Sequence, residues 1–399
     1  MKLKENDNVP EIRFDYFKEE WDKKRFKDFT KLSQGLQIAI SSRFLEDGEH
    51  RYFYITNEFL NPNSTKKYYI ESPSENVICT VDDILMTRTG NTGKVITNIS
   101  GAFHNNFFKV DYDKFETSKM FLYYLLTSND IQKEIIIRAG NSTIPDLNHS
   151  DFYSIKTSVP ALAEQSAIGS LFLTLDNLLA SYKDNLANYQ SLKVTMLSKM
   201  FPKAGQTVPE IRLDGFEGEW GKDTLEPYLT ESRISGDTGL TAKKLTVKLW
   251  GKGVIKKEEK YAGSLNTQYF IRKGGQFIYS KLDFQNQAFG IIPNELDGYQ
   301  STLDLPTFDI QNIDAKFLLE YVMRREFYEY QGLIANGSRK AKRIHSEDFL
   351  VMPVRIPYLE EQRAIGTYFS NLDNLINSYQ EKISQLETLK KKLLQDMFI

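Results

Sequence analysis

The chain has 399 residues, of which 51 are Lys or Arg and 53 are Asp or Glu, so that its formal charge is −2. This balance argues against an overall basic attraction to nucleic acid, and 41% hydrophobic residues exclude a largely disordered chain. The single cysteine, Cys79, excludes an intrachain disulfide, and without a signal peptide or an apolar run of about 18 residues we expect a cytoplasmic protein.

The first 152 residues contain a short opening segment and a first body. Residues 1–21 end in the string VPEIRFDYFKEEW, which runs from Val9 to Trp21. In the body, residues 22–152, aromatic and β-branched runs predict strands at 52–56, 84–88 and 95–97. Apolar periodicity predicts helices at 119–128 and 131–138. We therefore expect a mixed α/β domain.

Polar residues of this first body cluster at strand ends and in loops that contain glycine. Arg and Lys side chains can pair with guanine or with phosphates, and Asn side chains can pair with adenine. Such loops could read a DNA groove, or they could be ordinary solvated turns. The candidate DNA-contacting residues are Arg88, Asn91, Lys94, Asn105, Asn106, Arg138, Asn141 and Ser142.

Residues 153–207 form a linker and a long helix, predicted over 161–201. Apolar side chains recur there at alternating spacings of three and four residues, which is typical of a coiled-coil seam. A helix of this length spans roughly 60 Å at about 1.5 Å per residue. A single seam cannot bury itself, so the helix needs a partner helix or a globular body. The predicted seam residues are Ile168, Leu171, Leu175, Leu178 and Tyr182.

The second half of the chain repeats the first. The string VPEIRLDGFEGEW, from Val208 to Trp220, shares nine of its thirteen residues with the string 199 residues earlier. It lies in a second short segment, 208–221, which is followed by a second body, 222–349. A second linker and long helix, 350–399, carry the matching seam residues Ile365, Tyr368, Leu372, Leu375 and Tyr379.

This duplication predicts a pseudo-two-fold tandem repeat: two mixed α/β bodies joined by two long antiparallel helices. Antiparallel pairing would also bring the N-terminal VPEIR string close to the end of the second helix. The repeated VPEIR strings and long helices form a frame around two bodies that barely resemble each other. We therefore expect one architecture with two different recognition surfaces. Ordinary drift after duplication is the alternative.

The second body is predicted to have strands at 276–280 and 289–292 and one helix at 315–330. Between Thr238 and Lys281 it has ten basic residues against two acidic ones, which could form a basic patch for phosphates or a solvated lysine-rich face. Its candidate DNA-contacting residues are Lys243, Lys244, Lys248, Lys281, Gln285, Asn286, Gln287, Ser338, Arg339, Lys340, Lys342 and Arg343.

No catalytic or metal-binding constellation is recognisable. The four histidines are scattered and lack the spacing of metal ligands. The segment TRTGNTGKV, from Thr87 to Val95, has its glycines too close together for a phosphate loop and has Val95 where a magnesium-binding Ser or Thr would stand. We therefore expect no metal, no cofactor and no catalytic residue on this chain.

The frame resembles the specificity subunit of Type I restriction-modification enzymes. Each long helix opens on Pro-x-Leu-x-Glu-Gln, at Pro160 and Pro357, and continues to Leu-Asp-Asn-Leu. The VPEIR string before each body is similar to the staphylococcal and Gram-positive branch. The resemblance implies a non-catalytic DNA reader, in which two target-recognition domains each read one half of a bipartite double-stranded target and the helices set the spacer.

The resemblance also implies the partners. Two modification subunits would dock on the helices and methylate adenine with S-adenosylmethionine, and restriction subunits would add ATP- and magnesium-dependent translocation and cleavage. The alternative is a protein-interaction scaffold whose two bodies bind polypeptides and have no preference for a DNA sequence.

Overall fold

The computed structural model describes residues 9–140, 145–258, 263–334 and 343–399, and it divides into two compact units. Unit 1 consists of residues 1–183 and 381–399, and unit 2 consists of residues 184–380. The division crosses both long helices, α5 (Leu162–Lys199) and α9 (Leu359–Asp396). Each unit is therefore one body together with half of each long helix.

Unit 1 is built on a four-stranded antiparallel sheet in the order β2-β9-β6-β7. A second sheet, in the order β4-β3-β8-β5, pairs β3 and β8 in parallel and its other neighbours antiparallel. The strands are β2 (Thr30–Gln34), β3 (Arg51–Ile55), β4 (Tyr69–Glu71), β5 (Ile78–Cys79), β6 (Ile84–Thr87), β7 (Val95–Thr97), β8 (Gly101–Phe103) and β9 (Phe107–Tyr112).

Four helices and a two-stranded ribbon complete the body of unit 1. The ribbon pairs β1 (Asp22–Arg25) with β10 (Lys156–Val159), so it joins the beginning and the end of the body. The helices are α1 (Phe26–Phe29), α2 (Lys119–Thr127), α3 (Asn129–Ala139) and α4 (His149–Ser154).

Unit 2 repeats this plan. Its antiparallel sheet has the order β12-β20-β17-β18, and its ribbon pairs β11 with β21. The strands are β11 (Gly221–Thr224), β12 (Leu229–Glu231), β13 (Ser235–Thr238), β14 (Leu245–Val247), β15 (Val254–Lys256), β16 (Gln268–Ile271), β17 (Phe277–Tyr279), β18 (Phe289–Ile291), β19 (Gln300–Ser301), β20 (Thr307–Ile310) and β21 (Pro353–Ile356). Its short helices are α6 (Ala315–Val322), α7 (Arg325–Gln331) and α8 (Ser346–Leu350).

The prediction of one helix over 315–330 was therefore wrong. Two helices occupy this range, and they meet at Met323 and Arg324. The apolar pattern continues through the junction because both helices pack on the same core. Their different backbone directions are not visible in the pattern.

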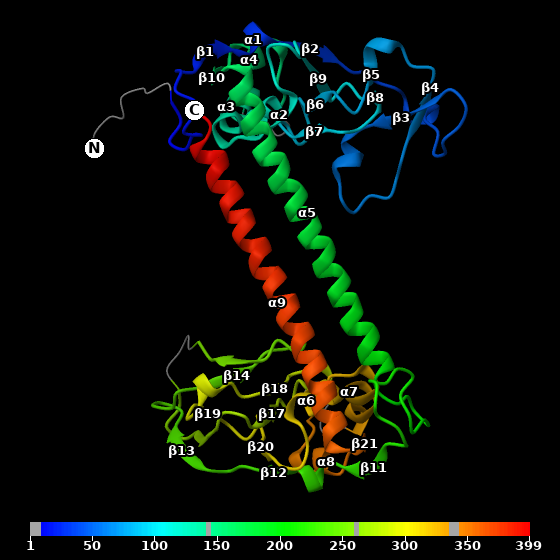
Figure 1. Ribbon diagram of the computed structural model, residues 1–399, viewed down its shortest axis with the longest axis vertical. Helices are drawn as coiled ribbons and strands as arrows, with labels where there is room; N and C mark the ends of the chain where they lie inside the picture. The colour runs from blue at the N-terminus through cyan, green and yellow to red at the C-terminus, as the bar shows by residue number, and fades with distance from the viewer. Residues whose placement is uncertain (1–8, 141–144, 259–262, 335–342) are drawn as a thin grey trace. The chain divides into compact units, whose positions relative to one another are not determined.

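Within each unit the halves of α5 and α9 run antiparallel, as predicted. In unit 1 Asp176 pairs with Lys390 and Lys183 with Glu387, and in unit 2 Tyr189 packs on Tyr379 and Lys193 pairs with Asp373. In unit 1 the N–H of Ile12 donates to the carbonyl oxygen of Asp396 at 3.0 Å, and in unit 2 the N–H of Ile211 donates to that of Lys199 at 2.9 Å. Each VPEIR string thus lies at the end of a long helix, as Figure 1 shows where the blue chain start meets the red end of α9.

A tryptophan marks the same position in each core. Trp21 packs on Phe121, which contacts Phe398 from the end of α9, with ring centroids 6.1 and 5.6 Å apart. Trp220 packs on Phe201, just beyond the end of α5, at 5.9 Å. Each core is thus completed by the end of the long helix that begins in the other unit, so neither half of the sequence forms a unit alone.

Six of the ten predicted seam positions, spaced seven residues apart in each helix, are buried or half-buried, and the other four are not the residues buried in the core. Ile168, Leu175, Ile365 and Leu372 are buried, Tyr182 and Tyr379 are half-buried, and Leu171 and Tyr368 lie partly buried against the cores. Leu178 and Leu375, however, are exposed. At three of the other four positions the buried residue is the next one in the sequence: Phe172, Leu179 and Phe369.

Matching ion pairs tie the strings to the helices. Arg13 holds both carboxylate oxygens of Glu164 at 2.6 and 2.7 Å, and Arg212 holds those of Glu361 at 2.8 and 2.7 Å. Both carboxylates are buried, and each guanidinium satisfies two acceptors at once. The glutamate of each Pro-x-Leu-x-Glu-Gln motif therefore has a structural role.

Among the described residues no helix could serve as a membrane span.

Candidate nucleic-acid interface

In unit 1, two of the polar loops predicted from the sequence and the segment before α4 meet at Arg88, directly after the central strand β6. The backbone N–H of Arg88 donates to the carbonyl oxygen of Asn106 at 2.7 Å. Its own carbonyl oxygen accepts from the N–H of Leu147 at 2.9 Å, just before α4. Segments that are far apart in the sequence therefore form one surface at the end of the sheet.

The guanidinium of Arg88 is already paired in this surface. Its Nε and Nη2 lie 3.0 and 2.6 Å from the two carboxylate oxygens of Asp146, and its Cζ lies 5.6 Å from the ring centre of Phe108. The pair holds the side chain in a defined orientation. A phosphate or a guanine edge would have to replace Asp146 or share the guanidinium with it.

The other candidates of unit 1 differ in accessibility. Asn91 and Lys94 are exposed, and their loop is fastened to α3 because Gln132 Nε2 donates to the carbonyl oxygen of Gly93 at 2.8 Å. Asn105 and Asn106 are half-buried, and Asn105 Nδ2 donates to Gln37 Oε1 at 3.2 Å.

The remaining candidates of unit 1 are less informative. Arg138 lies on α3 and pairs with Glu134 at 2.8 Å rather than pointing free into the loops. Asn141 and Ser142 lie outside the described residues.

Unit 2 has the same junction with different chemistry. Lys281, after the central strand β17, donates its N–H to the carbonyl oxygen of Asp304 at 3.0 Å and accepts from the N–H of Ile344 at 3.1 Å. It therefore stands where Arg88 stands in unit 1. In unit 1 the residue before Leu147 is Asp146. In unit 2 the residue before Ile344 is Arg343, which pairs with Asp304 at 3.5 Å.

A hairpin adds a second set of residues in unit 2. Strands β14 and β15 pair with each other, and their turn carries the exposed residues Lys248 and Lys252. The turn is fastened to the loop that contains the exposed Gln285 and the half-buried Asn286 and Gln287. The exposed tip residue of this turn, Trp250, was not among the predicted site residues, although an aromatic residue between lysines was a usable signal.

Two parts of the predicted basic patch were wrong. Lys244 is 5% exposed, and its ammonium donates to the carbonyl oxygen of Gly239 and lies 5.3 Å from the ring centre of Tyr269. Arg272 is fully buried and donates to Ser301 Oγ at 2.8 Å and to the carbonyl oxygen of Ser232 at 2.9 Å. Both cations stabilise the interior of the body because its loop carbonyls accept from them.

The exposed lysine Lys243 stays a candidate, whereas Ser338, Arg339, Lys340 and Lys342 lie outside the described residues. Burial lowers the pKa of Arg272 to about 10, which still leaves this side chain charged at neutral pH. The patch is therefore smaller than the sequence count indicates.

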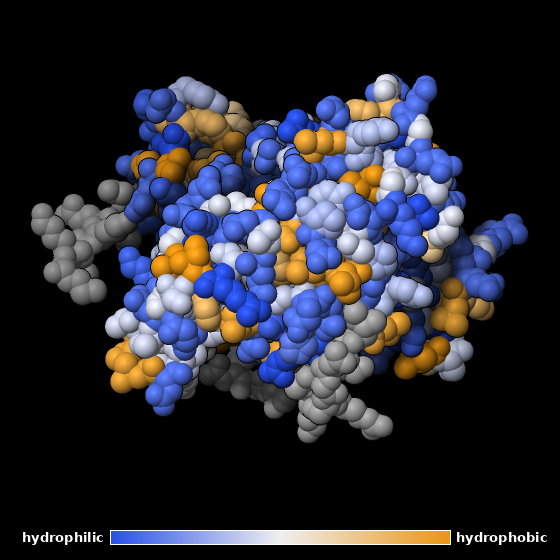
Figure 2. Space-filling model, turned by 90° about the horizontal axis from the view of Figure 1, so that it is seen from below, coloured by the Kyte–Doolittle hydropathy of each residue, from blue (hydrophilic) through white to orange (hydrophobic). Residues whose placement is uncertain are grey.

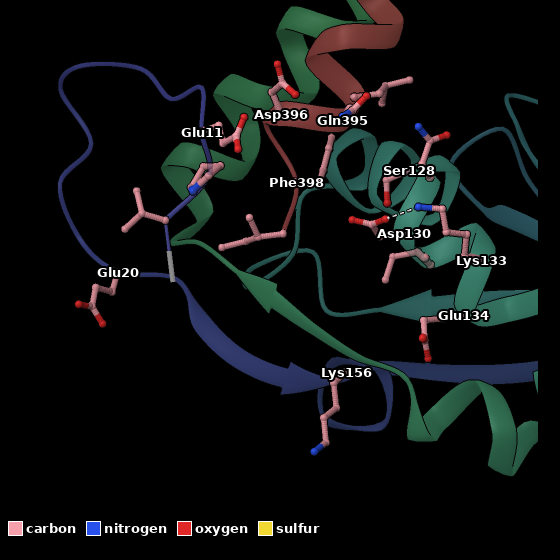
Figure 3. A pocket seen from close by; sticks show the side chains of 16 residues that line it. Glu11, Glu20, Ser128, Asp130, Lys133, Glu134, Lys156, Gln395, Asp396 and Phe398 are labelled. Carbon is pink, nitrogen blue, oxygen red and sulfur yellow. Dashed lines mark hydrogen bonds and ion pairs between the residues drawn. The ribbon is translucent and has the colours of Figure 1, made fainter. Parts of the chain in front are cut away.

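One pocket of unit 1 differs in charge from the loop surface around Arg88. It has a volume of about 1160 Å³ and lies between the start of α3, the end of α9 and the VPEIR string. Figure 3 shows that carboxylates dominate it: Glu11, Glu20, Asp130, Glu134 and Asp396 surround it, and Lys133 is paired with Asp130 at 3.0 Å. This charge opposes binding of a phosphate backbone.

The matching hollow in unit 2, beside α7 and β21, has a volume of about 700 Å³ and is basic. Its cations are Lys203, Lys222, Arg324, Arg325 and Arg355.

The face seen in Figure 2 has its hydrophobic side chains in small groups among hydrophilic ones. No set of three or more potential metal-binding His, Cys, Asp or Glu side chains occurs in the described part of the chain.

Comparison with known proteins shows which proteins this chain is similar to. Residues 18–188 match the family model described as "Type I restriction modification DNA specificity domain". These residues are therefore similar to that family's domain. They include the whole first body with the Arg88 junction and the first half of α5, so the matched range coincides closely with residues 1–183 of unit 1.

Similar proteins cover almost the whole chain. The Type I restriction enzyme MjaVIII specificity subunit of Methanocaldococcus jannaschii is 23% identical over 99% of this chain and 96% of its own length. The crystal structure of a Type I restriction-modification S subunit from M. genitalium has a TM-score of 0.62 at 15% identity and covers 98% of this chain and 99% of that one. The two-unit fold with long helices is therefore similar to the fold of that S subunit.

A third similar structure is the HsdS subunit from Thermoanaerobacter tengcongensis. It has a TM-score of 0.48 at 14% identity and covers 94% of this chain and 95% of that one.

Proposed function

We propose that this chain is the DNA specificity subunit of a Type I restriction-modification enzyme, in which each α/β body reads one half of a bipartite double-stranded target. The observation that carries this proposal is the repeated junction after the central strand. Arg88 and Lys281 occupy the same backbone position, and a different set of side chains surrounds each. One scaffold with two sets of recognition residues suits a target with two unlike halves.

The repeated frame provides two equivalent docking places for two modification subunits. Identical partners need identical surfaces, and the Arg13 and Arg212 ion pairs, the ribbons and the helix ends recur in both units. The two pockets cannot serve this purpose, because one is acidic and the other basic. Docking is therefore assigned to the helical frame.

The remaining roles belong to the partners. The chain itself is non-catalytic in this proposal, and S-adenosylmethionine, ATP and magnesium would be held by modification and restriction subunits, which methylate adenine and cleave DNA. The long helices would set the spacer between the half-sites. The chain would act in the cytoplasm, and the VPEIR strings favour the staphylococcal and Gram-positive branch.

The experiment that tests the function is a replacement of the first body. Residues 23–151 would be exchanged for the equivalent body of another specificity subunit, in a host that carries the complete system, and the methylated sequences would be read from genomic DNA. One half of the methylated sequence should change and the other half should stay. A change in both halves would contradict the assignment of one reader to each half.

The same experiment separates the main alternative. A protein-interaction scaffold would have no preference for a DNA sequence, so neither half of a methylated sequence would follow the exchanged body. As a control, the reciprocal replacement of residues 222–349 should change only the other half-site.

A further inference from the structure

Trp250 is held at the surface of unit 2 in an unusual way. Its side chain is 58% exposed at the turn between β14 and β15, whereas Trp21 and Trp220 are 1% and 2% exposed in the cores. Its φ angle is +60°, in the left-handed region that bulky side chains rarely adopt. Exposure of an indole and a left-handed backbone are both unfavourable, so this position calls for a role outside folding.

The turn is firmly built around this residue. The N–H of Trp250 donates to the carbonyl oxygen of Asn286 at 2.8 Å, and the N–H of Gly251 donates to that of Gln287 at 3.0 Å. Lys248 donates its N–H to the carbonyl oxygen of Gly253 at 2.8 Å, which closes the turn. A Cβ atom at Gly251 would overlap the methyl group of Met323, so the turn lies directly against the body.

The surroundings of the indole are suited to DNA. Lys248 and Lys252 flank it in the sequence and are both exposed, and the loop that fastens the turn carries the exposed amide of Gln285. Leu249, next to Trp250, is exposed as well. Cations that bind phosphates, amides that bind base edges and a rigid apolar tip are the elements of proteins that open a base step.

We propose that Trp250 is an intercalating wedge, which enters a base step of the half-site bound by unit 2 and stacks on a nucleobase. Lys248 and Lys252 hold the phosphates on either side of the opened step. This inference rests on the proposed function, because it requires that unit 2 binds duplex DNA. It adds a contact to the faces of the bases, which loops that read base edges do not make.

The test uses the full chain and duplex DNA with the methylated target sequence. Fluorescence anisotropy of labelled DNA reports binding, and tryptophan emission of the same samples reports stacking. Because Trp21 and Trp220 are buried, quenching by DNA should come from Trp250, and Trp250→Phe should abolish this quenching. If the chain binds DNA while its tryptophan emission stays unchanged, the wedge is wrong and the proposed function stands. If neither the chain nor its complex with modification subunits binds the target, the proposed function itself fails.

Two variants separate stacking from folding. Trp250→Ala should weaken binding about 10- to 100-fold, as expected for loss of one base stack, and Trp250→Phe should weaken it less. Trp250→Gly removes the ring but favours the left-handed backbone, so it should raise or preserve the melting temperature while DNA affinity falls. Phe115→Ala, which removes a 90% exposed aromatic ring in unit 1, is the control and should not change affinity. Unaltered DNA affinity of Trp250→Gly would overturn the proposal.

Discussion

The basic residues of unit 2 show that a charge in the sequence has a meaning only when its burial is known. Lys243, Lys248 and Lys252 are exposed, whereas Lys244 and Arg272 are inside the body and donate to loop carbonyls. The sequence predicted a basic segment correctly but could not tell which cations reach solvent. A loop carbonyl without a strand partner needs a donor, and a long basic side chain supplies it.

This distinction predicts different effects of neighbouring lysines on DNA binding. Replacing Lys248 and Lys252 together by Ala should weaken binding and reduce the slope of log affinity against log salt concentration by up to about 2, because about 0.9 counterions are released for each phosphate neutralised. Lys244→Ala should lower thermal stability and leave the slope unchanged. The measurement is a series of anisotropy titrations at several salt concentrations. An equal effect of Lys244→Ala on the slope would contradict its assigned position.

The long helices show which part of an element follows from its sequence. Their existence, their bounds to within a few residues and their antiparallel direction were predictable. The heptad pattern continues over a long segment in each half, and the VPEIR strings repeat. The seam was not fully predictable, because the chain offers adjacent apolar residues, Leu171 with Phe172 and Leu178 with Leu179. The larger ring of Phe172 fills the core in the structure, and the seam follows it.

The corrected seam can be tested with one adjacent pair of residues. Leu179 is 7% exposed and Leu178 is 37% exposed, although both are leucines in the same turn of α5. Leu179→Ala should lower the free energy of unfolding by about 2 to 5 kcal/mol, the usual loss for a buried leucine. Leu178→Ala should lower it by less than about 1 kcal/mol. Chemical denaturation measures both, and a larger loss for Leu178→Ala would restore the seam inferred from spacing alone.

The candidate site was predictable at the level of loops but not of individual contacts. Sequence reasoning found the loops after β6 and β17, because polar residues follow apolar strands there. It missed Trp250 because it predicted no strands on either side of this residue, so the turn between β14 and β15 was not expected. It also could not foresee that Asp146 pairs with Arg88, since the two residues are 58 positions apart.

At the scale of the whole molecule, the two halves depend on each other through the long helices. The core of unit 1 includes Phe398, which lies just beyond the end of α9. The core of unit 2 includes Phe201, which lies just beyond the end of α5. Both α5 and α9 contribute residues to both units. The length of these helices is therefore common to the two readers, and in the proposed function it sets the spacer.

This role of the helices predicts the effect of an insertion. Seven residues that continue the heptad pattern would be added after Lys183 in α5 and after Gln380 in α9, where the chain passes between the units. Each helix then lengthens by about 10.5 Å at 1.5 Å per residue, which corresponds to roughly three base pairs of 3.4 Å. The methylated sequence should keep both half-sites and gain about three unspecified base pairs between them. Insertion into α5 alone should abolish methylation, because the two seams then lose their common register. An unchanged spacer after the double insertion would show that the helices do not set it.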